Sequence, residues 1–183
     1  MRKIKLRKNK SKRTSLKNDR EYYEIVEDIL SNMEFRKTIN YKHHYYSSIF
    51  DHSLYVSYYS YRITKKLKLD YISTARGALL HDFFLYDDRI DHPEKGKNHW
   101  KEHPKTALRN ASKHFTLNKI EQDIIINHMW PLTKTIPKSK EAFVVTTVDK
   151  NLASKEFFNE AKNVLGNRVS NLLKKYRLKR RNK

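Results

Sequence analysis

The chain has 183 residues, which is long enough for one compact domain with a buried core and short for two. It contains no cysteine, 3 glycines and 4 prolines, which indicates a helix-rich protein with neither disulfide bonds nor thiolate metal ligands. The formal net charge is +20 at pH 7. No stretch has the roughly 18 consecutive apolar residues that a membrane span requires. The basic N-terminus is not followed by the apolar core of a signal peptide. We therefore expect a cytoplasmic protein without a transmembrane segment.

The positive charge is concentrated at the two ends of the chain. Residues 1–18 hold nine Lys and Arg side chains and no acid, and we expect them to form a disordered basic arm. Residues 174–183 are predicted to form a basic C-terminal tail, since nothing acidic follows Glu160. Such segments are usually solvated and mobile, and weak contact with a polyanion, RNA or anionic lipid, is the functional alternative.

Residues 19–173, between these ends, are expected to form one helical domain. Apolar side chains recur at helical spacing after Asn18 or Asp19, either of which can cap the first helix, whereas residues 34–49 indicate mixed helix and loop. A long helix is predicted over residues 51–68. Its packing stripe is expected at His52, Val56, Tyr59, Ile63 and Leu67.

The next predicted helix begins after Asp70 and ends at the pair His81 and Asp82, with Gly77 and Ala78 allowing close approach to a neighbouring helix. Residues 83–100 are predicted to form a loop, which by its length is expected to cover a site.

After that loop, Pro104 suits the first position of a helix that follows His103. A further helix is predicted to end near His128, before Pro131. A closing helix is predicted over residues 157–173.

The residues most informative about function are potential metal ligands spread through these elements. They are His52, the pair His81 and Asp82, His103, His128 and Asp149. Imidazole nitrogens and carboxylate oxygens without thiolates suit divalent iron, manganese or zinc. Because each residue lies in or beside a predicted helix, a helical bundle can direct all of them into one cavity.

This ordered set resembles the HD-domain metal-dependent phosphohydrolase superfamily, in its variants with extra histidines that hold two metals. The local strings that carry the resemblance are Asp51 to Val56, Ala78 to Asp82, His103-Pro104 and Asn127-His128. The resemblance covers roughly residues 40–160 and implies an all-α, HD-domain helical bundle. It also favours a helix at residues 143–148, whose composition alone is typical of a strand.

The resemblance implies a role for each ligand. His52, His81, Asp82 and Asp149 would hold the first metal, while the second oxygen of Asp82 would bridge to a second metal held by His103 and His128. The implied cofactor is a divalent metal, with two ions expected, Fe or Mn first and Zn, Mg, Ni or Co as further options. The implied reaction is hydrolysis through a metal-activated water.

Other residues have weaker claims to the chemistry. Asp82 and His81 are the expected catalytic centre, His99 is a candidate proton donor, and Lys150 is the best candidate to bind substrate phosphate because it adjoins Asp149. Three further cations are possible phosphate contacts, and three further histidines have a minor claim. The cations are Arg89, Lys97 and Lys134, and the histidines are His43, His44 and His92. His114 is expected at the surface.

Departures from the family pattern leave the substrate open. Phe83, Phe84 and Leu85 follow the His-Asp pair, so the lysine of many cyclic-nucleotide-cleaving relatives is absent. After His128 the chain reads Met-Trp-Pro in place of the Gly-Tyr-Pro of the cyclic dinucleotide branch. We expect a metal-dependent phosphohydrolase acting on a phosphate ester or anhydride of a nucleotide-like small molecule. The alternatives are a di-iron oxygenase with the same ligands and a nucleic-acid-binding module with a relic metal site.

Overall fold

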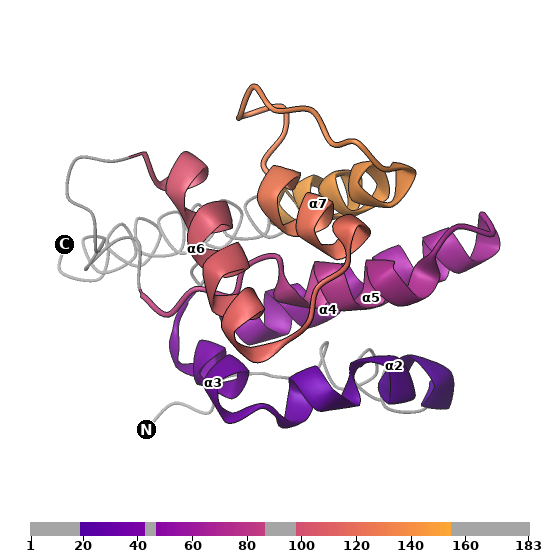
Figure 1. The fold of residues 1–183 in the computed structure, drawn as a ribbon, viewed down its shortest axis with the longest axis horizontal. Helices are drawn as coiled ribbons and strands as arrows, with labels where there is room; N and C mark the ends of the chain where they lie inside the picture. The colour runs from indigo at the N-terminus through magenta and orange to yellow at the C-terminus, as the bar shows by residue number, and fades with distance from the viewer. Residues whose placement is uncertain (1–18, 43–46, 87–97, 155–183) are drawn as a thin grey trace, which may run out of the picture. The chain divides into compact units, whose positions relative to one another are not determined.

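The computed structural model describes residues 19–42, 47–86 and 98–154 (Figure 1). The chain divides into two units, residues 1–149 and 150–183. The basic arm, the basic tail, the closing helix and most of the loop predicted at residues 83–100 lie outside the described residues, so their predictions stay predictions. The described residues belong to the first unit, apart from residues 150–154, which continue its last helix.

The described residues are helical, which confirms the all-α prediction. The elements in chain order are α2 (Arg20–Ser31), α3 (Met33–Arg36), the 3-10 helix η1 (Lys37–Asn40), α4 (Ile49–Lys66), α5 (Tyr71–Leu80), α6 (His99–His114) and α7 (Lys119–Asn127). A further helix covers residues 140–154, including the segment with strand-like composition. The β-structure within the described ranges is one isolated bridge between Lys42 and Ser48.

Polar side chains begin these helices as the sequence suggests. Asp19 caps α2 and Asp70 caps α5, each accepting a hydrogen bond from a backbone N–H of the first turn. Asn118 and Glu121 form a capping box on α7. The long helix α4 begins two residues earlier than expected, because the hydroxyl of Ser48 accepts from the N–H of Asp51 and caps it.

The prediction that His103 and Pro104 begin a helix was wrong, because α6 begins at His99. The side chain of Asn98 accepts a hydrogen bond from the N–H of Trp100 and provides the cap. Pro104 is therefore inside the helix, where its ring nitrogen cannot donate to the carbonyl of Trp100. As a result, His99 and His103 lie one turn apart on the same helix.

The predicted packing stripe on α4 is only partly right. His52 and Val56 are buried, whereas Ile63 is 40% exposed and Leu67 is 58% exposed. The buried face continues instead through small hydroxyl side chains, which are Ser53, Ser57, Ser60 and Thr64. Small side chains let α4 and α5 approach closely, and the hydroxyl of Ser57 donates to the carbonyl of Ala75 at 2.6 Å. The seam between these helices is therefore polar as well as tight.

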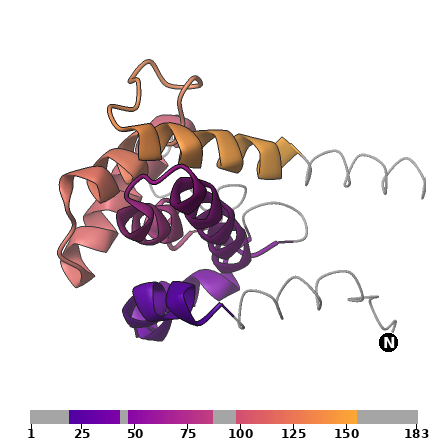
Figure 2. The ribbon, with the colours of Figure 1, turned by 90° about the vertical axis from the view of Figure 1, so that its right-hand side faces the viewer.

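Helix α5 is central to the first unit. It packs against α4, α7 and α2, and in Figures 1 and 2 the pair α4 and α5 lies between α2 on one side and α7 on the other. Arg76 connects three of these helices: it donates to Asp28 and the carbonyl of Ile25 on α2, and to Glu121 on α7. The main apolar core fills the space around α5, with residues that include Tyr22, Phe35, Leu79, Phe83 and Ile125.

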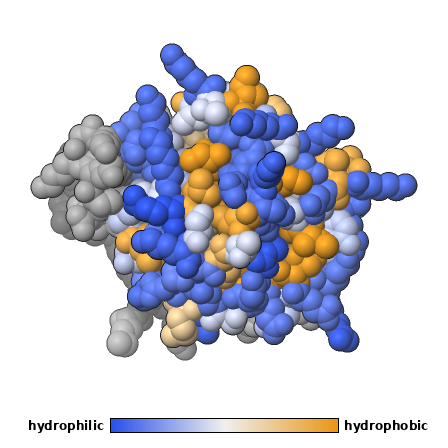
Figure 3. Space-filling model, in the orientation of Figure 1, coloured by the Kyte–Doolittle hydropathy of each residue, from blue (hydrophilic) through white to orange (hydrophobic). Residues whose placement is uncertain are grey.

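Apolar residues on the outer surface are separated by hydrophilic ones. Figure 3 shows them as distinct patches on the face seen in Figure 1. Among the described helices, none combines the length and apolar character that crossing a bilayer requires.

Gly77 lies where α5 meets α7. A Cβ atom at this position would be 3.0 Å from the Cα of Glu121 and 3.0 Å from the Cδ1 of Ile124. A backbone atom cannot move aside as the end of a flexible side chain can. The absence of a side chain at Gly77 therefore sets the distance between these two helices.

Gly77→Ala should lower the free energy of unfolding by about 1 to 2 kcal/mol, because overpacking against α7 outweighs the roughly 1 kcal/mol that alanine gains in helix propensity. Urea denaturation measures the change. Ser112→Ala, at an exposed position of α6, is the control and should be neutral or slightly stabilising. A variant at residue 77 that is more stable than the wild type would contradict this packing account.

Candidate metal centre

The ligand cluster, defined as His52, His81, Asp82, His103, His128 and Asp149, comes together in the first unit. His52 belongs to α4, His81 follows the last residue of α5, and Asp149 belongs to the helix over residues 140–154. Nε2 of His52 lies 2.9 Å from Oδ1 of Asp149, and Nε2 of His81 lies 3.8 Å from the same oxygen. These three residues form one group that could hold a metal ion.

Asp82 connects this group to the remaining histidines. Its Oδ2 lies 3.2 Å from Nε2 of His81, while its Oδ1 lies 3.3 Å from Nε2 of His103 and 3.4 Å from Nε2 of His128. The two oxygens of one carboxylate therefore face two different sets of imidazoles. The arrangement matches a carboxylate that bridges two metal positions.

Three of the four imidazoles in the cluster lie against backbone carbonyls. Nδ1 of His81 lies 2.8 Å from the carbonyl of Ala78, and Nδ1 of His128 lies 2.8 Å from the carbonyl of Ile125. Nδ1 of His103 lies 2.9 Å from the carbonyl of His99. A carbonyl can only accept, so each of these Nδ1 atoms carries the proton. In the metal-binding form of the ring, the lone pair of Nε2 then faces the cluster.

The position of two ligands at helix ends explains how these bonds arise. His81 is the C-cap residue of α5 and His128 is the C-cap residue of α7. The last four carbonyls of a helix lack intrahelical partners, and here two imidazoles supply a donor to one carbonyl at each end. Both helices also direct the negative ends of their dipoles toward the cluster, which favours a bound cation.

The cluster fits divalent metal ions chemically. Nε2 of His103 and Nε2 of His128 are 2.8 Å apart, and with both lone pairs turned inward they repel unless a cation lies between them. Two nitrogens that each lie about 2.1 Å from one ion, with a nitrogen–ion–nitrogen angle of about 90°, would be about 3 Å apart. The observed separation is close to this distance. Nε2 of His81 is buried and makes no hydrogen bond to the described residues.

Burial strengthens these electrostatic preferences, because no residue of the cluster is more than 5% exposed. Burial is the largest effect on His128 and lowers its pKa to about 4. Asp82 has a smaller opposing effect, while His81 and His103 lower the pKa a little further. The imidazole of His128 is therefore neutral at physiological pH, which is the form that binds metal.

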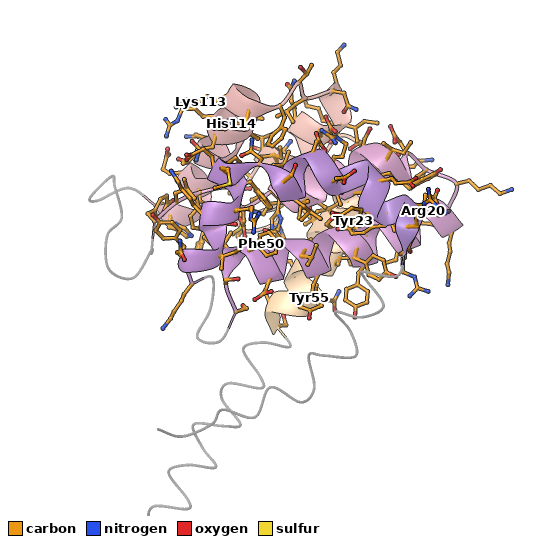
Figure 4. All side chains as sticks on the ribbon, turned by 90° about the horizontal axis from the view of Figure 1, so that it is seen from below. Arg20, Tyr23, Phe50, Tyr55, Lys113 and His114 are labelled. Atoms are coloured by element: carbon orange, nitrogen blue, oxygen red, sulfur yellow. The ribbon has the colours of Figure 1, made fainter. Side chains whose placement is uncertain are left out.

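The other predicted residues are placed as follows. The ring of His99 stacks on that of His103, with centroids 4.5 Å apart. Lys150, which follows Asp149, is the first residue of the second unit, so its part in phosphate binding stays a prediction. His114 is exposed, as expected, and Figure 4 shows it beside Lys113. Lys134 is also exposed. Arg89, Lys97, His43, His44 and His92 lie outside the described residues.

Two residues near the cluster were not identified from the sequence as functional. The rings of Phe84 and His103 have centroids 5.5 Å apart, and those of Tyr86 and His99 have centroids 5.9 Å apart. Their place directly after the His-Asp pair is the sequence signal that points to them. The carbonyl partners were also missed, although they lie three or four residues before each histidine, as helical spacing requires.

In chelator-treated protein, the contribution of His128 to stability should fall as the pH is lowered from about 6.5 toward 4. The folded pKa lies below the unfolded value, so the unfolded chain binds the proton more readily over this interval and acid favours unfolding. The expected loss is roughly 2 kcal/mol. Urea denaturation at pH 7 and pH 4.5 measures it, with His128→Gln as the reference without an imidazole. An equal pH dependence in both proteins would contradict the low pKa.

Comparison with known proteins agrees with this geometry. The family model described as the HD domain matches residues 49–154, more than half of the chain, and this range contains every residue of the ligand cluster. No match was found among curated proteins or solved structures. Proteins with this domain are mostly metal-dependent phosphohydrolases. The matched range and the fold together show that the chain belongs to the HD domain family.

Proposed function

We propose that the protein is a phosphohydrolase that uses two divalent ions, iron or manganese first, to cleave a phosphate ester or anhydride of a nucleotide-like small molecule. The observation that supports this most directly is the division of the Asp82 carboxylate between two sets of imidazoles. A shared carboxylate fixes the spacing of two ions, and paired ions about 3.5 to 4 Å apart suit phosphoryl transfer.

The proposal assigns each residue to a position. His52, His81, Asp149 and Oδ2 of Asp82 form the first metal position, and His103, His128 and Oδ1 of Asp82 form the second. When bound, the ions would lower the pKa of water and neutralise charge that develops on the phosphate. The residues themselves would hold the ions, and each is at most 5% exposed, which limits access of bulk water.

Charge balance supports an anionic substrate. Asp82 and Asp149 supply two negative charges, and an imidazole that binds a metal through Nε2 while Nδ1–H donates to a carbonyl adds no charge. Two divalent ions would therefore exceed the negative charge of their ligands. The remaining positive charge would lie in a buried site, where its attraction for a phosphate group is stronger than in water.

Two further residues keep the roles expected from the sequence. His99 stacks on His103 of the second metal position, and we assign it the role of proton donor. Lys150 follows the ligand Asp149 in sequence and is proposed to bind a phosphate oxygen.

A di-iron oxygenase is the main rival, because the same ligands serve both kinds of chemistry. Hydrolysis requires no oxygen, so phosphate release should proceed at the same rate in anaerobic and aerobic buffer. Turnover that stops without oxygen, and that consumes it when present, would favour the oxygenase.

Contact with RNA or anionic lipid through the basic ends is a separate proposal, supported by the nine basic and no acidic side chains of residues 1–18. Counterion release predicts that such binding weakens steeply with salt. Removal of residues 1–17 and 174–183 should abolish it and leave phosphohydrolase turnover intact.

Asp82→Ala should lower turnover on the best phosphate substrate by at least about 10³-fold, because it removes the residue common to both metal positions. Metal content should fall in parallel. His103→Ala should lose only the second ion, since the first position keeps its ligands. Elemental analysis and a phosphate-release assay measure both effects.

His114→Ala is the matched control, because His114 lies on the same helix as His103 and is exposed. It should keep wild-type metal content and turnover. Wild-type turnover in Asp82→Ala, with loss in His114→Ala, would show that the site is assigned to the wrong residues.

A further inference from the structure

Four aromatic rings form a cluster beside the second metal position. This aromatic cluster consists of Phe84, Tyr86, His99 and His103. Phe84 is in contact with each of the other three, with ring centroids 4.7 Å from Tyr86, 5.6 Å from His99 and 5.5 Å from His103. Phe84 and Tyr86 also pack with Ile49 in a small core of their own.

Within this cluster, His99 supports His103 in two ways. Its carbonyl accepts the Nδ1–H of His103 at 2.9 Å, which fixes the tautomer of that ring. Its imidazole stacks on the imidazole of His103, with centroids 4.5 Å apart and planes 25° apart. The hydroxyl of Tyr86 lies 3.4 Å from Nδ1 of His99, and the ring of Phe84 meets that of His99 edge-on. The ring of His99 is therefore itself held from two sides.

His103 is held differently from the histidines of the first metal position. His52 and His81 are fully buried, on α4 and at the end of α5, among the helices of the main core. His103 belongs to α6 and lies one turn from its first residue. Its ring lies against those of Phe84 and His99 in the aromatic cluster and that of His128 outside it.

We propose that His99, supported by Phe84 and Tyr86, is a positioning residue that sets the affinity of the second metal position through its stack on His103. Without the ring of His99, the imidazole of His103 would gain torsional freedom. A metal ion would then have to order that imidazole on binding, and this entropy cost would weaken the affinity. Residues that orient metal ligands typically change affinity by about 10- to 100-fold when they are removed. The inference depends on the proposed two-metal centre, and it does not depend on the substrate or on turnover.

The test is Mn²⁺ binding by the full chain after chelator treatment, measured as the number of ions bound and the affinity of each by calorimetric titration. Wild type should bind two ions. His99→Ala, which keeps the carbonyl and removes the ring, should bind the first ion as wild type does and the second about 10- to 100-fold more weakly. His114→Ala is the matched histidine control on the same helix and should bind both ions normally.

His99→Phe separates positioning from proton transfer. Phenylalanine can stack on His103 but cannot exchange a proton, so it should restore most of the second affinity without restoring a proton donor. Thermal unfolding of the chelator-treated variants should resemble wild type, since His99 is half-buried at the first residue of its helix.

Two results would overturn the inference and leave the proposed two-metal function standing. Two ions bound by His99→Ala with wild-type affinities would show that the stack does not position His103. Equal loss in His99→Phe and His99→Ala would show that stacking is not the cause. A single ion bound by wild type would overturn the two-metal function as well.

Discussion

The carboxylate of Asp82 is buried between imidazoles that approach it from both sides, and this constraint governs the rest of the site. A buried charge is costly unless other groups compensate it. Here Nε2 atoms lie 3.2 Å from one oxygen and 3.3 Å and 3.4 Å from the other. To bring three histidines this close, α5, α6 and α7 must place particular residues at one location. The turn that ends α5 and the close contact of α5 with α7 at Gly77 serve that requirement.

The fold class could be predicted from the sequence, and so could the six side chains that come together as candidate ligands. The histidines and aspartates occur in an order that resembles a known family, and each accompanies a helical pattern. The helix over residues 140–154 is instructive, because its β-branched residues favour a strand when taken alone. Buried helices tolerate such residues where tertiary packing outweighs propensity. The order of ligands was therefore more informative here than local composition.

Other features could not be predicted, for identifiable physical reasons. The stripe on α4 was assigned to apolar residues, but the close approach of α4 and α5 selects serine and threonine at the contact and leaves Ile63 and Leu67 exposed. The start of α6 was assigned from Pro104, although the cap of Asn98 places that proline inside the helix. This error concealed the relation between His99 and His103. The rings of His99 and His103 can stack one turn apart only if the helix begins at or before residue 99.

The Nδ1 atoms of His81, His103 and His128 lie against main-chain oxygens, and this determines what mutagenesis can change. No side-chain substitution at Ala78, Ile125 or His99 deletes the acceptor, because every residue there brings a carbonyl. Helix geometry thus determines which ring nitrogen of these histidines carries the proton. Alanine substitution at the acceptor residues cannot reveal this, because alanine keeps the carbonyl. Only a change that unwinds the last turn of α5 or α7, or the first turn of α6, would alter it. Side chains at these positions can therefore affect the histidines only through packing, as proposed for the ring of His99, and not by removal of the acceptor.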